Sequence, residues 1–257
     1  MKREKIAIKT PEQVAIMHHG GKILANVMGQ LIAAVKPGVT ELAIDQLAEK
    51  LIRAQGGEPG FKRVEGYTYT ICISTNDVVV HGIPGNYAFK PGDIVGIDCG
   101  VYYKGFHTDM SESTIVPDEG FIPAESSVKF LNLGKQALDE AIKVATIGNH
   151  IGDISKTIQD IVQKKGGYSI VRSLIGHGVG RELHEAPEVP GYLVGKIENT
   201  PLLREGMTIA VEVIYNMGGA EVVLDHDGWT IRSEDASLAG LFERTIAITK
   251  QGTMLLT

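Results

Sequence analysis

The sequence predicts an α/β (α+β) fold built from two related halves. One observation is a weak internal repeat: the ranges 38–57 and 148–167 have equal length, and each places apolar residues at helical spacing before a Gly-Gly pair. Another is that each range precedes an apolar run ending in His-Gly. A third is that each His-Gly precedes a strand-like segment ending in a carboxylate, at Asp98 and at Glu212. Because this order occurs twice, we expect a pseudo-twofold arrangement with one central site.

Length and composition favour a single catalytic domain, residues 1–257, with repeat halves at roughly 10–120 and 125–250. A chain of 257 residues with 43% hydrophobic content is long enough to bury a large core. The chain carries a net charge of −6, whereas most nucleic-acid-binding proteins are basic. No segment of the sequence is long and apolar enough for a membrane span. We therefore expect no direct nucleic-acid site and no membrane partner.

Cysteine content and the opening residues predict the compartment. Two cysteines are too few for a disulfide framework, and the opening MKREKIAIKT lacks the apolar stretch of a signal peptide. We expect a cytoplasmic protein with reduced thiols.

The helices are predicted from caps and apolar spacing. Thr10, Pro11 and Gln13 supply an N-cap, a first-turn proline and a capping-box glutamine. Apolar residues then recur every three or four positions until the helix ends near Pro37. The two repeated ranges, 38–57 and 148–167, are predicted to form helices closed by their Gly-Gly pairs.

The His-Gly segments follow these repeated helices. His81 in VVVHGIPG and His177 in LIGHGVG are interpreted as repeat partners at the ends of β-rich runs. His177 could be a metal ligand, a catalytic base or a packed core residue, and a second histidine, His184, lies seven positions further on. These residues by themselves leave the three roles open.

Carboxylates lie among apolar neighbours in several strand-like segments. Asp98 and Asp109 flank the turn-like segment 102–105, so they could lie on paired strands of a hairpin. Glu212 and Glu243 each lie within an apolar run. A buried carboxylate needs a cation or several donors to stay ionised, although Asp109 and Glu243 are equally consistent with solvent-facing strand positions.

Together with His177, these carboxylates form an oxygen-rich set. Such ligands suit Mn, Fe, Co or Zn in a paired site better than they suit a cysteine-rich structural zinc, which predicts a hydrolytic two-metal centre. The sequence contains no HExxH, GxSxG or GxxxxGK[ST] motif, which argues against zincin-type peptidases, serine hydrolases of the α/β type and P-loop NTPases.

Six segments carry a resemblance to a known family: HGIP at 81–84, DIVGIDCG, HTDMSES, GHGVGRELHEAP, EGMTIAVE and FERTIAIT. On these motifs the chain resembles the methionine aminopeptidases of the short, type I kind, without an N-terminal extension or a type II insertion. The resemblance implies a pita-bread fold, a pseudo-twofold repeat of helix-helix-strand units around a central antiparallel sheet. It also implies metal-dependent hydrolysis that removes the N-terminal methionine from peptides and nascent proteins through a metal-bridging hydroxide.

The same resemblance implies residue roles. Two divalent metal ions, of Co, Mn, Fe or Zn, would be held by five ligands: Asp98, Asp109, His177, Glu212 and Glu243. His81 and His184 would contact the substrate and the developing intermediate, and Glu212 would also accept a proton. The methionine pocket would include Tyr67, Cys72, Leu183 and Trp229.

Two alternatives belong to other classes, namely an Xaa-Pro exopeptidase of the same fold and a metal-free peptide-binding relative. Relatives of the first kind generally carry a large extra N-terminal domain, and relatives of the second kind typically lack ligands. The chain departs from the family at Leu174, Gly191 and Val213, and at Glu65 within the pocket segment 61–70. The physiological metal and the breadth of side-chain specificity are not predicted.

The expected partners are the N-termini of peptides and nascent chains. A transient ribosome contact is left open by the sequence, and a monomer is expected.

Overall fold

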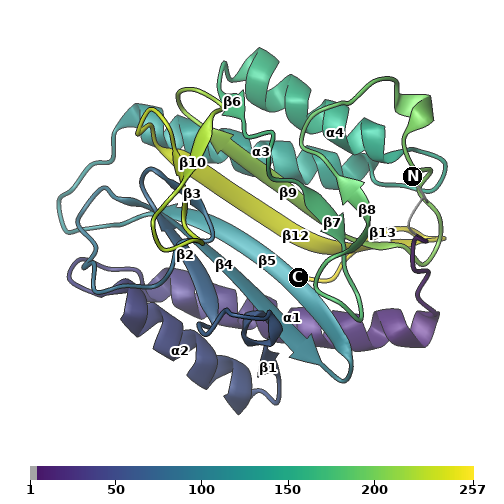
Figure 1. Cartoon of the computed structure of the whole chain (residues 1–257), viewed down its shortest axis with the longest axis horizontal. Coiled ribbons are helices and arrows are strands. Elements are labelled where there is room, and N and C mark those ends of the chain that lie inside the picture. Colours follow the sequence, from purple (N-terminus) through teal and green to yellow (C-terminus); the bar gives the residue numbers. More distant parts are fainter. Residues whose placement is uncertain (1–4) are drawn as a thin grey trace.

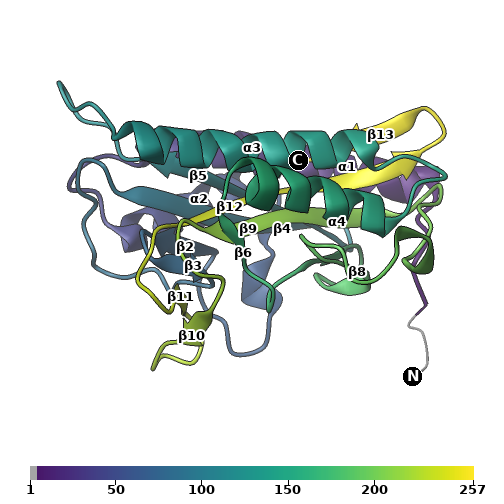
Figure 2. The ribbon, with the colours of Figure 1, turned by 90° about the horizontal axis from the view of Figure 1, so that it is seen from above.

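The structure is a computed structural model of the whole chain, and residues 5–257 are described. A long antiparallel sheet forms its centre, and the long helices pack against one face of that sheet (Figures 1 and 2). A three-stranded sheet and several loops lie on the opposite side (Figure 2). Part of the opening segment used for the signal-peptide prediction, residues 1–4, lies outside the described residues.

The N-terminal half begins with a capped helix and ends with a long hairpin. As predicted, the Thr10 hydroxyl accepts a hydrogen bond from the Gln13 N–H, and the Gln13 side chain accepts one from the Thr10 N–H. The elements of this half are α1 (Pro11–Ala34), α2 (Glu41–Ala54), β1 (Glu58–Pro59), the 3-10 turn η1 (Phe61–Arg63), β2 (Ile71–Thr75), β3 (Val78–Val80), β4 (Ile94–Tyr103) and β5 (Phe106–Ile115).

The C-terminal half repeats two helices and two long strands, with additional short strands. Its elements are α3 (Glu125–Val144), α4 (Ile151–Gln159), the π-helical turn η2 (Asp160–Lys165), β6 (Ser169–Ile170), β7 (Gly176–Gly178), β8 (Glu185–Val189), η3 (Ile197–Asn199), β9 (Thr208–Asn216), β10 (Val222–Leu224), β11 (Ile231–Ser233), β12 (Ala239–Thr249) and β13 (Gly252–Leu255). Within residues 5–257, no helix is both long and apolar enough to cross a membrane.

Strand order confirms the pseudo-twofold, pita-bread arrangement. The main path through the large sheet is β1-β4-β5-β12-β9-β7-β8, with β2 also paired to β4. The hairpin β4-β5 of the first half therefore lies beside the pair β12-β9 of the second half (Figure 1). We call the junction of β5 with β12 the seam.

The predicted hairpin between Asp98 and Asp109 is confirmed. Strands β4 and β5 pair in continuous register up to Tyr103 and Phe106. The two residues of the turn, Lys104 and Gly105, have φ angles of 46° and 91°, as a two-residue hairpin turn requires.

The interpretation of His81 and His177 as repeat partners is wrong at the level of strand pairing. His177 lies on β7, which pairs with β9 in the large sheet. His81 follows β3, which pairs with β11 in the three-stranded sheet. In the first half the place of β7 is taken by β2, because β2 pairs with β4 as β7 pairs with β9. Similar local sequence thus serves two different sheets.

Alternation along the central strands separates core from site. On β4, Val95, Ile97 and Cys99 are buried in the hydrophobic cluster formed with α1 and α2. On β9, Val211 and Val213 are buried in the cluster formed with α3 and α4. Because successive side chains of a strand point to opposite faces, Asp98 and Glu212 must point away from both helical layers.

Candidate metal centre and its cavity

One row of polar side chains crosses the four central strands. Asp98 on β4 pairs with Ser111 on β5, Ser111 pairs with Glu243 on β12, and Glu243 pairs with Glu212 on β9. Paired residues share a face, so all four side chains point to the side of the sheet away from the helices. The Ser111 hydroxyl lies 2.9 Å from Asp98 Oδ1 and 2.9 Å from Glu243 Oε2, and it connects the two halves across the seam.

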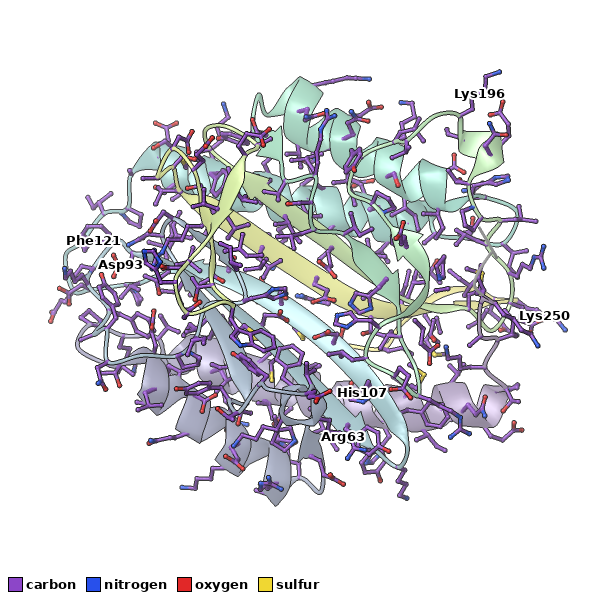
Figure 3. The ribbon with its side chains drawn as sticks, viewed as in Figure 1. Arg63, Asp93, His107, Phe121, Lys196 and Lys250 are labelled. Carbon is purple, nitrogen blue, oxygen red and sulfur yellow. The ribbon has the colours of Figure 1, made fainter. Side chains whose placement is uncertain are left out.

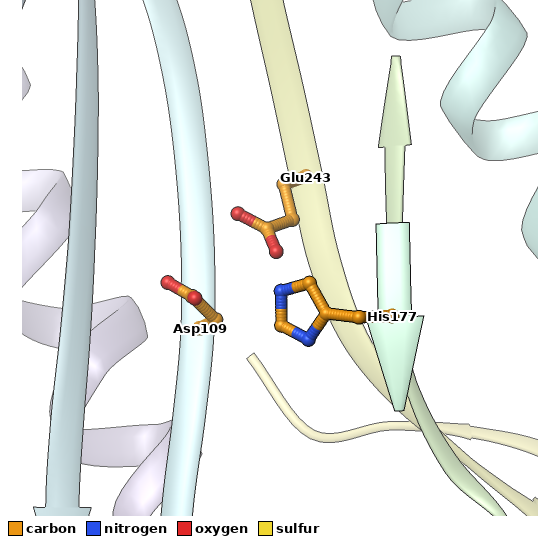
Figure 4. A group of neighbouring side chains, drawn as sticks. All are labelled: Asp109, His177 and Glu243. Atoms are coloured by element: carbon orange, nitrogen blue, oxygen red, sulfur yellow. The ribbon is translucent and has the colours of Figure 1, made fainter. Parts of the chain in front are cut away.

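Asp109 and His177 lie on the same side of this row, level with Thr245 on β12. Asp109 is two residues from Ser111 on β5, and His177 pairs with Ala210, two residues from Glu212. One ligand atom from each of Asp109, His177 and Glu243 lies within 4.8 Å of the others. Figure 4 shows these three neighbouring side chains on β5, β7 and β12. His177 Nε2 also lies 3.5 Å from Glu212 Oε1.

Burial of this many acids raises their pKa values. Burial raises the pKa of Asp98 to about 7, although the hydrogen bond from Ser111 opposes the shift. Burial, with repulsion from Asp98, raises the pKa of Glu212 to about 8. Burial and the neighbouring carboxylates hold the pKa values of Asp109 and Glu243 well above the usual range. Bound cations would lower these pKa values again and so favour the ionised carboxylates.

The solvent-facing alternative for Asp109 and Glu243 is wrong. Asp109 is 4% exposed and Glu243 is 2% exposed. Both face the site because β5 and β12 are central strands, with pairing partners on both sides.

The donor atoms fit divalent ions. His177 Nδ1 lies 2.9 Å from the backbone carbonyl of Gly178, and because a carbonyl can only accept, Nδ1 carries the proton and Nε2 keeps its lone pair for a metal. Burial lowers the pKa of His177 to about 4, so the ring is neutral at pH 7. Glu243 Oε1 is buried without a hydrogen-bond partner among the described residues, as an oxygen reserved for a cation would be.

An apolar pocket adjoins this cluster in the same cavity of about 320 Å³. Phe61, Tyr67, Cys72 and Leu183 are buried together, and Trp229 packs against them. The Tyr67 and Trp229 rings lie 5.1 Å apart. Cys72 pairs directly with Asp98, so the pocket begins one strand away from the acids. Unbranched, polarisable side chains suit such a soft apolar wall.

Both remaining predicted histidines line the cavity. The ring centroids of His184 and His177 lie 4.4 Å apart in an edge-to-face arrangement. His81 has a φ of 57°, a left-handed conformation that is unusual for a non-glycine residue. Burial lowers the pKa of both His81 and His184, so each presents one N–H donor and one acceptor at neutral pH.

The structure therefore brings every residue predicted for the site to one cavity, and it adds others. Ser111, Leu241, Phe61 and Val64 also line it and were not predicted. Alternation in HTDMSES could have indicated Ser111, because it lies two residues from Asp109 on the same strand face. No comparable signal marks Leu241, whose position depends on the pairing of strands far apart in sequence. Of the departures from the family pattern, Leu174 lines the cavity, whereas Glu65 is exposed.

Comparisons with known proteins agree with this geometry. The model of metallopeptidase family M24 matches residues 15–249. A methionine aminopeptidase of Clostridium perfringens is 39% identical over 98% of both chains. Methionine aminopeptidase 1 of Bacillus subtilis is 38% identical over 98% of this chain and 99% of its own.

Solved structures extend the comparison to the fold. A methionine aminopeptidase from Thermotoga maritima superposes with a TM-score of 0.93 and 37% identity, over 98% of this chain and 99% of that one. The prolidase from Pyrococcus furiosus superposes with a TM-score of 0.76 and 24% identity, over 97% of this chain but 65% of the prolidase. The second similarity concerns the fold alone.

Proposed function

This chain belongs to metallopeptidase family M24, and from that premise we propose that it removes the N-terminal methionine from peptides and nascent proteins. The protein is accordingly a metal-dependent hydrolase. The observation that carries the proposal is the convergence of the acid-histidine cluster and the soft apolar pocket in one cavity. The acid-histidine cluster would carry out the hydrolysis, and the apolar pocket would select the side chain of the first residue of the substrate.

Five side chains would hold two divalent ions: Asp98, Asp109, His177, Glu212 and Glu243. When bound, such ions lower the pKa of a water molecule from 15.7 to about 7 and so supply a nucleophile at neutral pH. The Ser111 hydroxyl hydrogen-bonds with the carboxyl groups of Asp98 and Glu243, and these two contacts orient both groups.

Substrate orientation comes from the chain's own residues. Tyr67, Cys72 and Trp229 receive the methionine side chain, and the adjacent acids receive the free α-amino group. A peptide bond further along a chain has no free α-amine, which restricts cleavage to the first residue. His81 and His184 donate N–H groups to the carbonyl oxygen of the scissile amide as it becomes an oxyanion, an interaction typically worth about 2.7–4 kcal/mol per donor in acyl transfer.

Glu212 transfers the proton during cleavage. Its carboxylate lies at the end of the polar row, beside His177 Nε2. A carboxylate in this position accepts the proton of the attacking water and passes it to the leaving amine.

The test is release of free methionine from Met-Ala-Ser, with norvaline-Ala-Ser and a Met-Pro peptide as comparators. We expect no release in chelator, and release from Met-Ala-Ser after addition of Mn, Co, Fe or Zn. Asp98→Ala should abolish the restored activity. Preferential cleavage of the Met-Pro peptide would instead support an Xaa-Pro exopeptidase, and failure to bind any of these ions would support a metal-free peptide-binding protein.

The remaining features of the proposal concern the whole protein. We expect residues 1–257 to act as one catalytic domain, since the proposed ligands come from both halves. The partners are peptide and nascent-chain N-termini, and the protein acts as a monomer in the cytoplasm, where its two free cysteines stay reduced.

A further inference from the structure

A second, more open cavity of about 800 Å³ begins where the catalytic cavity ends. The two cavities share Val64, Leu183 and His184 in their linings. One wall of the second cavity is the end of η1, the floor is the turn end of the β4-β5 hairpin, and the opposite wall is the segment 181–184. We call this second cavity the hairpin groove.

The position of the hairpin groove suits the downstream part of a substrate. With the first side chain in the apolar pocket and its carbonyl at the histidines, the rest of the peptide must leave the catalytic cavity. The groove begins at His184, one of those two histidines. A peptide that leaves past His184 therefore enters the groove directly, between Val64 and Leu183.

The walls of the groove are basic, although the whole chain carries a net charge of −6. Lys62, Arg63 and Arg181 line it, against one acid, Glu182. Lys62 is held by Glu49 at 2.6 Å, and Arg63 makes a longer contact of 3.6 Å with Glu58. Among the described residues, Arg181 has no acidic partner within ion-pair distance, so its charge is available to a ligand.

Two aromatic rings of the β4-β5 hairpin pack against the arginines of the two walls. The guanidinium of Arg63 lies 3.8 Å from the ring centroid of Tyr102, and that of Arg181 lies 5.0 Å from the ring centroid of Phe106. The Tyr102 ring in turn packs on His107 at 4.8 Å. Figure 3 shows Arg63 and His107 near each other beside β5. A guanidinium stacked on a ring keeps its N–H edges free for carboxylates.

We infer that the hairpin groove binds the residues that follow the scissile bond and favours acidic ones, with Arg181 and Arg63 as specificity determinants. This inference rests on the proposed function, because that function defines which end of the substrate lies in the catalytic cavity. The ligand is an extended peptide with Asp or Glu from its third residue onward.

The test measures binding without hydrolysis. The probe is Met-Ala-Asp-Glu-Asp-Lys, labelled with fluorescein on its lysine, and its twin carries Asn-Gln-Asn at the acidic positions. Fluorescence anisotropy in chelator gives both dissociation constants. We expect the acidic peptide to bind about fivefold more tightly, as exposed ion pairs allow, and the preference to vanish in 1 M salt.

Matched variants assign the preference to the groove. Arg181→Gln should abolish most of the preference and Arg63→Gln part of it, whereas Lys196→Gln, an equal change of charge at an exposed site beside η3, should leave it intact. Equal binding of the two peptides by the unmodified protein, no binding of either, or a preference that survives the double variant R63Q/R181Q would each overturn the inference.

Hydrolysis of the neutral twin separates this inference from the proposed function. If the metal-loaded protein releases methionine from the neutral twin but shows no acidic preference in binding, the function stands and the groove inference fails. If binding shows the preference and no metal restores methionine release, the groove is a peptide site and the proposed reaction is wrong.

Discussion

The two halves of the sheet have matching backbones but different side chains. Asp98 pairs with Ser111 in the first half, Glu212 pairs with Glu243 in the second, and Ser111 pairs with Glu243 across the seam. The pseudo-twofold therefore relates Asp98 to Glu212 and Ser111 to Glu243. Asp98 and its counterpart Glu212 are both acids, whereas Ser111 is a serine and its counterpart Glu243 is an acid.

The asymmetry continues on both sides of that row. Asp109 pairs with Gly100 and Leu241 pairs with Ile214, so the acid at 109 corresponds to a leucine in the second half. His177 pairs with Ala210 and Ser74 pairs with Gly96, so the histidine corresponds to a serine in the first half. The repeat supplies a symmetric frame, and single substitutions on it place Asp109 and His177, one from each half, at the same end of the row, level with Thr245.

The seam itself stays nearly symmetric. Its ladder contains two registered pairs, Glu243 with Ser111 and Arg244 with Met110. Beyond them Ser113 Oγ donates to the Leu241 carbonyl at 2.8 Å and accepts from its N–H at 3.1 Å. At the other end Thr245 Oγ1 makes the same two bonds with the backbone of Asp109, at 2.8 and 2.9 Å. Side-chain hydroxyls thus complete the ladder where the strands diverge.

The largest effect should come from breaking the asymmetry at position 109. Asp109→Asn should lower kcat/KM for Met-Ala-Ser by about 10³-fold or more, because a lost metal ion removes several kcal/mol of transition-state stabilisation. Leu241→Met, a change of similar volume at the corresponding position, should change kcat/KM by only a few fold. Methionine release and elemental analysis of bound metal test both variants, and equal losses would contradict the unequal roles.

Acidity provides the second comparison. Asp98 and Glu212, the matched pair, have pKa values raised to about 7 and about 8. The folded, metal-free protein therefore keeps two protons that the unfolded chain releases above about pH 4, and proton binding favours the folded state. This contribution to the free energy of unfolding is fully present below pH 4 and is lost as the pH rises through 7 and 8. Denaturant unfolding in chelator should show several kcal/mol less stability at pH 9 than at pH 5.

Mn addition supplies the control for this pH series. Because bound cations favour the ionised carboxylates, the decline between pH 5 and pH 9 should be reduced or reversed when Mn is present. A metal-free protein whose stability is constant from pH 5 to pH 9 would show that these acids ionise in the folded state without cost.

The serine of the row should matter less than its ligands. Ser111→Ala removes the hydroxyl that orients Asp98 and Glu243, and loss of such an outer contact typically costs 10–100-fold in metal affinity or activity. Metal titration followed by the fluorescence of Trp229, the single tryptophan, together with kcat/KM, measures the effect. Ser111→Thr, which keeps a hydroxyl, should restore most of the activity.

The smallest effect should distinguish the two ends of the seam. Ser113→Ala and Thr245→Val each remove two hydrogen bonds to backbone, so each should lower the free energy of unfolding by about 1–3 kcal/mol. Only Thr245→Val loosens the segment that carries Asp109, so it alone should also weaken metal binding. Unfolding curves and metal titrations of both variants decide this, and an equal loss of metal affinity would refute the distinction.

Much of this frame follows from local sequence. Strand-carboxylate segments ending at Asp98 and Glu212 were predicted as a matched pair, and the structure places them at equivalent positions of β4 and β9. The hairpin beyond Asp98 was predicted from its turn residues. In each case the signal, alternation or turn chemistry, lies within about ten residues of the feature it predicts.

Features that depend on long-range register were not predictable. The contact between Ser111 and Glu243 joins residues 132 positions apart, and nothing in either segment specifies that pairing. The error over His81 has the same origin, because a Val-rich strand next to His-Gly can pair in either sheet. The cavity residues Phe61 and Val64 were missed because their segment is irregular and lacks strand periodicity.

The polar row crosses the seam, and this has a consequence for the lifetime of the protein. Ions held by residues of both halves cross-link distant parts of the chain, so metal binding adds RT ln(1 + [M]/Kd) to the stability of the folded state. Proteases act mainly on opened molecules. The supply of divalent ions in the cell would therefore set the rate of turnover of this protein as well as its activity, and metal-starved molecules would be degraded first.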